Sequence, residues 1–348
     1  MTKNVHMSDN LRVCWECPSN IALVKYWGKR PGQLPVNPSL SFSLSQAVSR
    51  TSVSLVSKGR EKLQFLFEGK PSTFEERIKN YLDVLAAKLP WIGDYGFVME
   101  SSNTFPHSAG IASSASAFGA LALCLAELDD RLHHRTGPDA GFFGRASALA
   151  RIGSGSACRS VYPGFAWWGE APEVAGSSDE YAVPVSALPH YKGLRDAVLL
   201  IDSAKKDVSS SAGHELMNRH PYRDGRIAQA AENARELLHL LQTGHFGRFF
   251  ELAEQEAFSL HALMMSSSPA FLLLKPASLK VIEKIRAFRT ETGLPVGLTI
   301  DAGPNIHFLY FENDREEVHR FIDLELASLL EEGKWLDDGI GSGPVRIK

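Results

Sequence analysis

The sequence has few cysteines and no long apolar run. Only 4 of its 348 residues are cysteine, too few for the disulfide framework of a small secreted domain. No stretch approaches the ~20 consecutive apolar residues of a membrane-spanning helix. Residues 1–10 are polar and contain no apolar core of a signal peptide. We therefore expect a cytoplasmic protein with no membrane partner.

An excess of positive charge is also absent. The chain has 37 Lys and Arg against 40 Asp and Glu, which gives a net charge of −3. Such a balance provides no general attraction to nucleic acid, and we expect no nucleic-acid partner. The 44% hydrophobic and 22% charged content is that of an ordinary globular protein. Any anionic ligand must therefore be bound by a local group of residues.

Two of the cysteines, Cys14 and Cys17, have the C-x-x-C spacing of zinc and redox sites. A structural zinc needs four ligands, and the other two cysteines do not form a second pair. Cys124 lies in an apolar helical pattern and Cys158 in a Ser/Gly loop. A metal or redox role stays an alternative, but we expect a strand that places Cys14 and Cys17 on opposite faces.

Hydrophobic periodicity predicts an α+β fold. Strands are expected over 11–17, 39–45, 51–56, 62–67, 97–101, 197–201, 297–300 and 307–311. Helices are expected over 74–88, 113–134, 141–151, 226–242, 245–265, 276–292 and 316–330. The two types are mixed without a strict βαβ alternation. The polar stretch 174–191 suggests a boundary near residue 190, which divides the chain into domains 1–190 and 191–348.

A loop of small and polar residues leads directly into the helix expected at 113. Glycine and alanine allow a ligand to approach the backbone, and the first turn of a helix offers free N–H groups to a phosphate. Hydroxyls at Ser113 and Ser114 suit a phosphate or Mg²⁺. The simpler alternative is an ordinary serine cap. The candidate phosphate-binding residues are Ser102, Asn103, Ser108, Ala109, Gly110, Ile111, Ala112, Ser113 and Ser114.

This loop is neither a Walker A motif nor a dinucleotide fingerprint. Its pattern, Pro-x-x-x-Gly-x-Ala-Ser-Ser from Pro106, resembles the phosphate loop of the GHMP kinases. Four other segments resemble motifs of one branch of that superfamily, the diphosphomevalonate decarboxylases, and occur in the family's order. They are residues 18–29, 153–160, 205–210 and 301–305.

Three residues in these segments suit catalysis on a polyanion. Lys25 lies in an apolar run, where an unpaired ammonium group would be costly. Arg159 follows a Gly/Ser segment and offers a planar fork to a carboxylate or diphosphate. Asp301 stands at the end of an apolar strand. Each also has a structural explanation: a lysine that reaches the surface, a solvated loop arginine, and a turn-forming aspartate.

The resemblance implies the two-lobed GHMP kinase fold, with an N-terminal lobe like ribosomal protein S5 domain 2, a ferredoxin-like α/β-plait C-terminal lobe, and an active-site cleft between them. It also implies ATP-dependent phosphorylation of the 3-hydroxyl of (R)-5-diphosphomevalonate. Loss of phosphate and CO2 then yields isopentenyl diphosphate, in the mevalonate pathway of isoprenoid biosynthesis. The family is commonly homodimeric.

The same resemblance assigns roles to residues. Asp301 matches the catalytic base, Lys25 the lysine beside it, and Arg159 a group that orients the substrate. ATP is the co-substrate, and Mg²⁺ bound with it is expected at Ser113 and Ser114. The matched substrate-binding residues are Asn20, Tyr26, Lys29, Ser154, Ser156, Arg159 and Ser210.

The chain departs from the family pattern at Pro38, His107 and His214. Residues 331–348 match nothing in the family, and we expect them to form a surface extension. Two other functions remain as alternatives. A related kinase would stop after phosphorylation, as a mevalonate 3-kinase does, but the full Lys/Arg/Asp set favours decarboxylation. A non-catalytic sensor would be expected to lose a catalytic group or to gain a DNA-binding segment, and the sequence shows neither.

Overall fold

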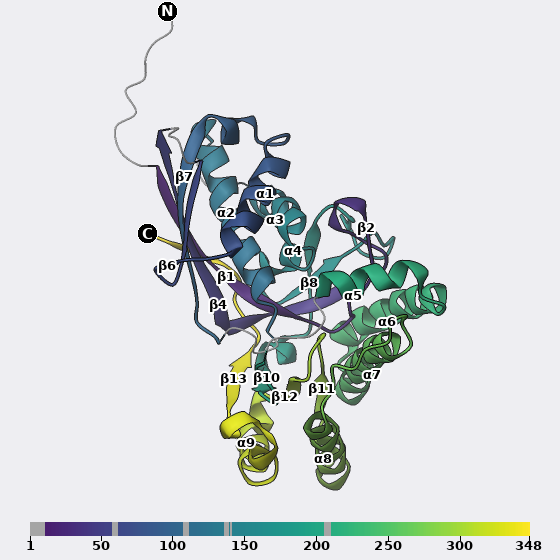
Figure 1. The fold of residues 1–348 in the computed structure, drawn as a ribbon. Coiled ribbons are helices and arrows are strands. Elements are labelled where there is room, and N and C mark those ends of the chain that lie inside the picture. The colour runs from purple at the N-terminus through teal and green to yellow at the C-terminus, as the bar shows by residue number, and fades with distance from the viewer. Residues whose placement is uncertain (1–10, 58–61, 107–110, 136–138, 140, 205–209) are drawn as a thin grey trace, which may run out of the picture.

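The computed structural model describes residues 11–57, 62–106, 111–135, 139, 141–204 and 210–348, with only the backbone for 210–212. Two sheets and their helices form the molecule (Figure 1). The strands are β1 (Arg12–Ala22), β2 (Lys29–Arg30), β3 (Leu34–Pro35), β4 (Ser39–Ser57), β5 (Leu63–Phe67), β6 (Lys70–Pro71), β7 (Tyr95–Asn103), β8 (Phe165–Trp168), β9 (Ala182–Val185), β10 (Leu194–Leu199), β11 (Gly297–Thr299), β12 (Ile306–Phe311), β13 (Trp335–Gly339) and β14 (Val345–Ile347). The helices are α1 (Phe74–Leu85), α2 (Ser113–Leu132), α3 (Phe142–Gly153), α4 (Ala157–Ser160), α5 (Ser210–Leu216), α6 (Arg223–Thr243), α7 (Phe246–Met265), α8 (Pro276–Thr292) and α9 (Arg315–Phe321).

The first sheet belongs mainly to the N-terminal half and has the order β14-β1-β4-β7-β5-β6, with β8 paired to β4 and β9 to β8. Strand β4 spans both of the strands expected at 39–45 and 51–56. It can be this long because its first part pairs with β8 and its last part with β7. Strand β9 lies in the segment expected to be a polar transition.

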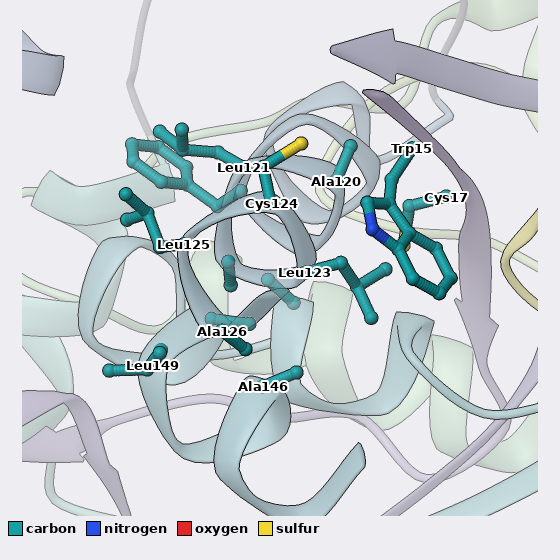
Figure 2. Close-up of a cluster of buried hydrophobic side chains, with 14 of the residues drawn as sticks. Trp15, Cys17, Ala120, Leu121, Leu123, Cys124, Leu125, Ala126, Ala146 and Leu149 are labelled. Carbon is teal, nitrogen blue, oxygen red and sulfur yellow. The ribbon is translucent and has the colours of Figure 1, made fainter. Parts of the chain in front are cut away.

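Helices α1 to α4 cover one face of this sheet (Figure 1). Trp15 and Cys17 of β1 point into the core against Leu123 and its neighbours on α2 (Figure 2). Cys14 is only half-buried, so it and Cys17 lie on opposite faces of the strand, as expected. All four cysteines are free thiols.

The second sheet is antiparallel, with the order β11-β12-β10-β13. One face packs on α8 and α9 through a core that includes Phe308 and Ile285. On the other face, Val198 and Leu309 share a core with Phe42 of the first sheet. The lobes therefore meet through a continuous apolar interface, and the mixed α+β architecture agrees with the expectation from sequence.

The C-terminal residues do not form the surface extension expected for 331–348, and that prediction was wrong. Strand β13 pairs with β10 in the second sheet, and β14 returns to the first sheet beside β1. The Asp338 carboxylate accepts hydrogen bonds from Ser45 N, Gln46 N and Ala47 N across the interface. Local composition could not reveal these strands because their partners are more than 130 residues away in the chain. No helix in the described ranges is long and apolar enough to span a membrane.

Candidate active site

The central feature of the candidate site is an ion pair between the lobes. Lys25 follows β1 in the first lobe, and Asp301 follows β11 in the second. Lys25 Nζ donates a hydrogen bond to Asp301 Oδ1 at 2.7 Å. The lysine side chain is 2% exposed and that of the aspartate 25%. A partly exposed carboxylate beside a buried ammonium group is held ionised and can accept a proton from a ligand.

Helix α7 holds both members of this pair by their main chains. Glu256 Oε2 accepts a hydrogen bond from Lys25 N at 3.0 Å, and His261 Nε2 donates to the Asp301 carbonyl oxygen at 3.1 Å. Glu256 itself is fully buried in a bidentate pair with Arg226 of α6, at 2.6 and 2.7 Å. Asn233 Nδ2 adds a further donor to Glu256 at 2.6 Å.

Sequence reasoning missed this supporting network. The network lies on two long helices, with Arg226 on α6 and with Glu256 and His261 on α7. These helices carry many charged residues, and the sequence does not show which of them are buried and paired. The only available signal was that helical periodicity places Glu256 on the buried side of α7, next to Ala253 and Ala257. A buried carboxylate needs a partner, but sequence alone does not identify it.

Arg159 of α4 lies in the wall of the same region. It is 1% exposed, and its guanidinium group donates hydrogen bonds to Ser39 Oγ, Ser41 Oγ and Asn20 Oδ1 at 2.7 to 3.3 Å. These acceptors are neutral, and no described carboxylate forms an ion pair with it. Burial lowers the pKa of Arg159, and the nearby Asp301 charge raises it. A buried guanidinium group whose described hydrogen-bond acceptors are all neutral favours an anionic ligand.

Asn20 and Tyr26 connect Arg159 with the Gly/Ser segment that precedes it, residues 153–158. Asn20 Nδ2 donates to the Ser156 carbonyl at 3.1 Å and to Ser160 Oγ at 2.8 Å. The Tyr26 hydroxyl is buried and has no hydrogen-bond partner within the described residues. It lies so close to Gly155 that a Cβ there would approach it to 2.9 Å. An unpaired hydroxyl beside a Gly/Ser loop is a place for a ligand oxygen.

Lys29 lies at the rim, where its ammonium group donates to Gln33 Oε1 at 3.0 Å. Partial burial lowers its pKa, and the neighbouring Glu215 raises it.

Ser154 Oγ is 3.2 Å from Ser114 Oγ, so the Gly/Ser segment adjoins the start of α2. Ser210 begins α5, and its side chain lies outside the described residues.

The phosphate loop is only partly described. Ile111, Ala112, Ser113 and Ser114 lie at the start of α2, whereas Ser108, Ala109, Gly110 and His107 lie outside the described residues. A cavity of about 260 Å³ opens beside Ser113 and Asn103, and its other walls include Phe65, Phe74, Met99 and Leu121. The structure does not bring Ser102 into this cavity, because successive side chains of a strand point to opposite faces.

The described part of the chain contains no group of three or more His, Cys, Asp and Glu side chains that could hold a metal ion. The hydroxyls of Ser113 and Ser114 are partly exposed and could complete the coordination of an ion that arrives on a phosphate.

A second buried pair lies close to Asp301. His307 Nδ1 and Asp196 Oδ2 are 2.7 Å apart, and both side chains are fully buried. Burial alone would lower the pKa of His307, but Asp196 raises it above its usual value. His307 stands opposite Thr299, two residues before Asp301. Its sequence position in a short apolar strand gave no signal of a partner.

Two family models match the chain. The diphosphomevalonate decarboxylase-like N-terminal domain covers residues 17–182, and the mevalonate 5-diphosphate decarboxylase C-terminal domain covers residues 197–333. Both include parts of the site described above, with Lys25 and Arg159 in the first and Asp301 in the second.

Relatives agree with the family models over most of the chain. The diphosphomevalonate decarboxylase of Debaryomyces hansenii is 32% identical over 86% of this chain and 79% of its own. That of Gibberella zeae is 30% identical over 98% of both chains. The crystal structure of mevalonate diphosphate decarboxylase from Staphylococcus aureus matches with a TM-score of 0.85 and 30% identity, over 98% of this chain and 99% of that one. A structure of MDDEF in complex with MVAPP, AMPPCP and magnesium matches with a TM-score of 0.84 and 28% identity, over 98% and 100%. The chain belongs to the diphosphomevalonate decarboxylase family.

Proposed function

We propose that this chain phosphorylates the 3-hydroxyl of (R)-5-diphosphomevalonate with ATP and then releases phosphate and CO2 to form isopentenyl diphosphate. A single observation carries the proposal. Arg159 is buried in the same site as the Lys25–Asp301 pair, and no described carboxylate forms an ion pair with it. The substrate carries both a carboxylate and a diphosphate. Either anion would supply a negatively charged partner for the Arg159 guanidinium group.

Asp301 serves as the base in this reaction. Its partly exposed carboxylate takes the proton of the tertiary hydroxyl while the oxygen attacks the γ-phosphorus of ATP. Lys25 keeps Asp301 ionised and offers positive charge to the transferring phosphoryl group. The phosphate then leaves with the C3–O electron pair. The electrons of the bond to the carboxyl carbon form the new C=C bond as CO2 departs, so no electron-sink cofactor is needed.

The other residues bind the two substrates. Tyr26, with its unpaired hydroxyl, and Lys29, Ser154, Ser156 and Ser210 receive the diphosphate, while Asn20 orients Arg159 toward the carboxylate. Asn103, Ser113 and Ser114 receive ATP, whose base enters the apolar cavity beside them. Ser113 and Ser114 would hold Mg²⁺ bound to the ATP phosphates, where the ion would neutralise charge on the transferring phosphoryl group. A relative was solved with MVAPP, AMPPCP and magnesium.

In this proposal, domain 1–190 binds both substrates and domain 191–348 carries the base. We also propose a homodimer in the cytoplasm. The resemblance to the family supports the dimer, and the four free thiols suit a reducing compartment. Light scattering coupled to size-exclusion chromatography tests the dimer, because a mass near 38.2 kDa would show a monomer instead.

The decisive experiment follows ADP, CO2 and isopentenyl diphosphate together after ATP, Mg²⁺ and (R)-5-diphosphomevalonate are added to the purified protein. The proposal requires all three products in equal amounts. ADP with a stable 3-phosphorylated product and no CO2 would identify a kinase. Absence of turnover with every mevalonate derivative would support the binding-protein alternative.

A further inference from the structure

Helix α5 contacts the segment that follows Lys25. A Cβ on Gly213 would approach the Trp27 ring to 2.5 Å, which shows how closely the helix packs on the indole. The ring of His214 lies between those of Tyr26 and Trp27, with centroids 4.6 and 4.7 Å away. The side chain of Met217 would come within 2.9 Å of a Cβ on Gly28.

The polar contact in this group is specific. Gly28 N donates a hydrogen bond to His214 Nδ1 at 3.0 Å, so the ring is neutral at that nitrogen. Gly28 has a φ of +86°, a conformation that a residue with a side chain rarely adopts. The backbone therefore turns at Gly28, between Tyr26 and Lys29, and the hydrogen bond to His214 stabilises this turn.

We propose that His214 is a positioning residue that fixes Tyr26 and Lys29 for the anionic end of the substrate. It orients the Tyr26 ring by a tilted ring contact, and it orients the backbone that leads to Lys29 by its hydrogen bond with Gly28. This inference rests on the proposed function, because Tyr26 and Lys29 are assigned to the diphosphate there. Since His214 itself does not touch the reacting atoms in this account, its loss should affect binding far more than chemistry.

Within the described residues, His214 Nδ1 is the acceptor of the Gly28 N–H group. Gly28 is buried, and loss of the imidazole nitrogen would leave its N–H group without a partner. Such a group is costly, and a small backbone rotation that brings it to water relieves the cost. A rotation at Gly28 would shift the backbone that leads to Lys29.

The test compares His214→Leu with His214→Asn. Leucine fills the space without an acceptor, whereas an asparagine oxygen can occupy the position of Nδ1. Calorimetry measures the Kd of (R)-5-diphosphomevalonate without ATP, and steady-state assays measure kcat. We expect the leucine variant to raise Kd about tenfold, as for loss of one hydrogen bond with a buried N–H left unpaired. The asparagine variant should stay within about threefold of wild type, and kcat should change little in both.

His220→Leu is the matched control. His220 is also buried, and its ring contacts the main-chain oxygen of Leu263 at 3.0 Å. Within the described residues, none of its side-chain hydrogen bonds reaches residues 26–28. It should lower the melting temperature without changing the Kd. An unchanged Kd in a folded His214→Leu protein, or an equal loss in both His214 variants, would overturn the inference. If wild type binds but does not turn over the substrate, the proposed function fails while this inference can still be judged from Kd.

If His214→Leu does not fold, His214→Asn and His214→Gln keep the question open to measurement. Glutamine has an acceptor but places it one bond farther along the side chain. The inference then requires a weaker Kd for the glutamine variant than for the asparagine variant. Equal Kd values in these two folded proteins would overturn it.

Discussion

Lys25 Nζ lies 2.7 Å from Asp301 Oδ1, although 276 positions separate the two residues in the chain. The contact joins the two lobes at the point where the chemistry is proposed. Helix α7 contacts the backbone of both residues through Glu256 and His261. The geometry of the pair therefore depends on a helix that carries neither member.

Asp301→Asn should abolish most turnover without preventing binding. The amide keeps the size of the carboxylate but cannot take the proton of the tertiary hydroxyl, a role worth ~10²–10⁴-fold in rate. We expect kcat to fall by that range while the Kd of the substrate changes little. Product analysis with calorimetry measures both. Full activity in the variant would remove Asp301 from the role of base.

Glu256→Leu should destabilise the protein and slow the reaction. It leaves Arg226 as a buried charge without its partner, at a cost of ~3–5 kcal/mol. It also removes the acceptor of Lys25 N, so the lysine is held less firmly against Asp301. Urea unfolding and kcat are the two measurements.

The double variant Arg226→Met with Glu256→Leu separates these two effects. Replacement of both charges by apolar side chains often restores stability. The acceptor of Lys25 N is still missing, so we expect the unfolding free energy to recover while kcat stays low. Arg248→Ala is a control, because its pair with Glu236 is exposed and should contribute less than ~1 kcal/mol. Recovery of kcat together with stability would show that Glu256 acts on stability alone.

His214 should make the folded protein sensitive to acid. Burial, together with the charge of Lys29, lowers the pKa of His214 to about 3. Below pH ~6.5 the unfolded chain binds a proton that the folded ring excludes, so stability is lost as the pH falls from there. Each pH unit in this window should cost up to ~1.4 kcal/mol of unfolding free energy. Urea titrations of wild type and His214→Asn between pH 4.5 and 7.5, a range chosen around the usual pKa of ~6.5, should therefore differ in slope.

An exposed histidine serves as the control for the slope of unfolding free energy against pH. His239 is exposed on the surface of α6. His239→Asn should therefore leave the pH dependence of stability as in wild type. Parallel curves for wild type and His214→Asn would contradict the buried, neutral state of this ring.

Sequence predicted those parts of the fold that depend on local periodicity. Helix α8 begins and ends where the pattern indicated, and the main elements of both lobes were expected. The motifs also predicted that Lys25, Arg159 and Asp301 share a site. What could not be predicted depends on partners that are distant in the chain. Strand β14 forms because the edge of β1 is available for pairing. The role of the buried Glu256 is visible only in the structure, where its carboxylate accepts the hydrogen bond from Lys25 N.

Asp338→Asn should weaken the junction between the lobes. Both oxygens of this buried carboxylate accept hydrogen bonds from the backbone at residues 45–47, where β4 passes from one pairing partner to another. An amide would direct its own N–H groups at some of these donors, and we expect a loss of ~1–3 kcal/mol. Because β13 also supports β10 in the second lobe, the lobes should separate more easily and Lys25 should lose contact with Asp301 more often. The measurements are urea unfolding and kcat, with Asp224→Asn as the control, since that side chain is 94% exposed. A loss no larger than in the control would show that the apolar interface alone fixes the two lobes.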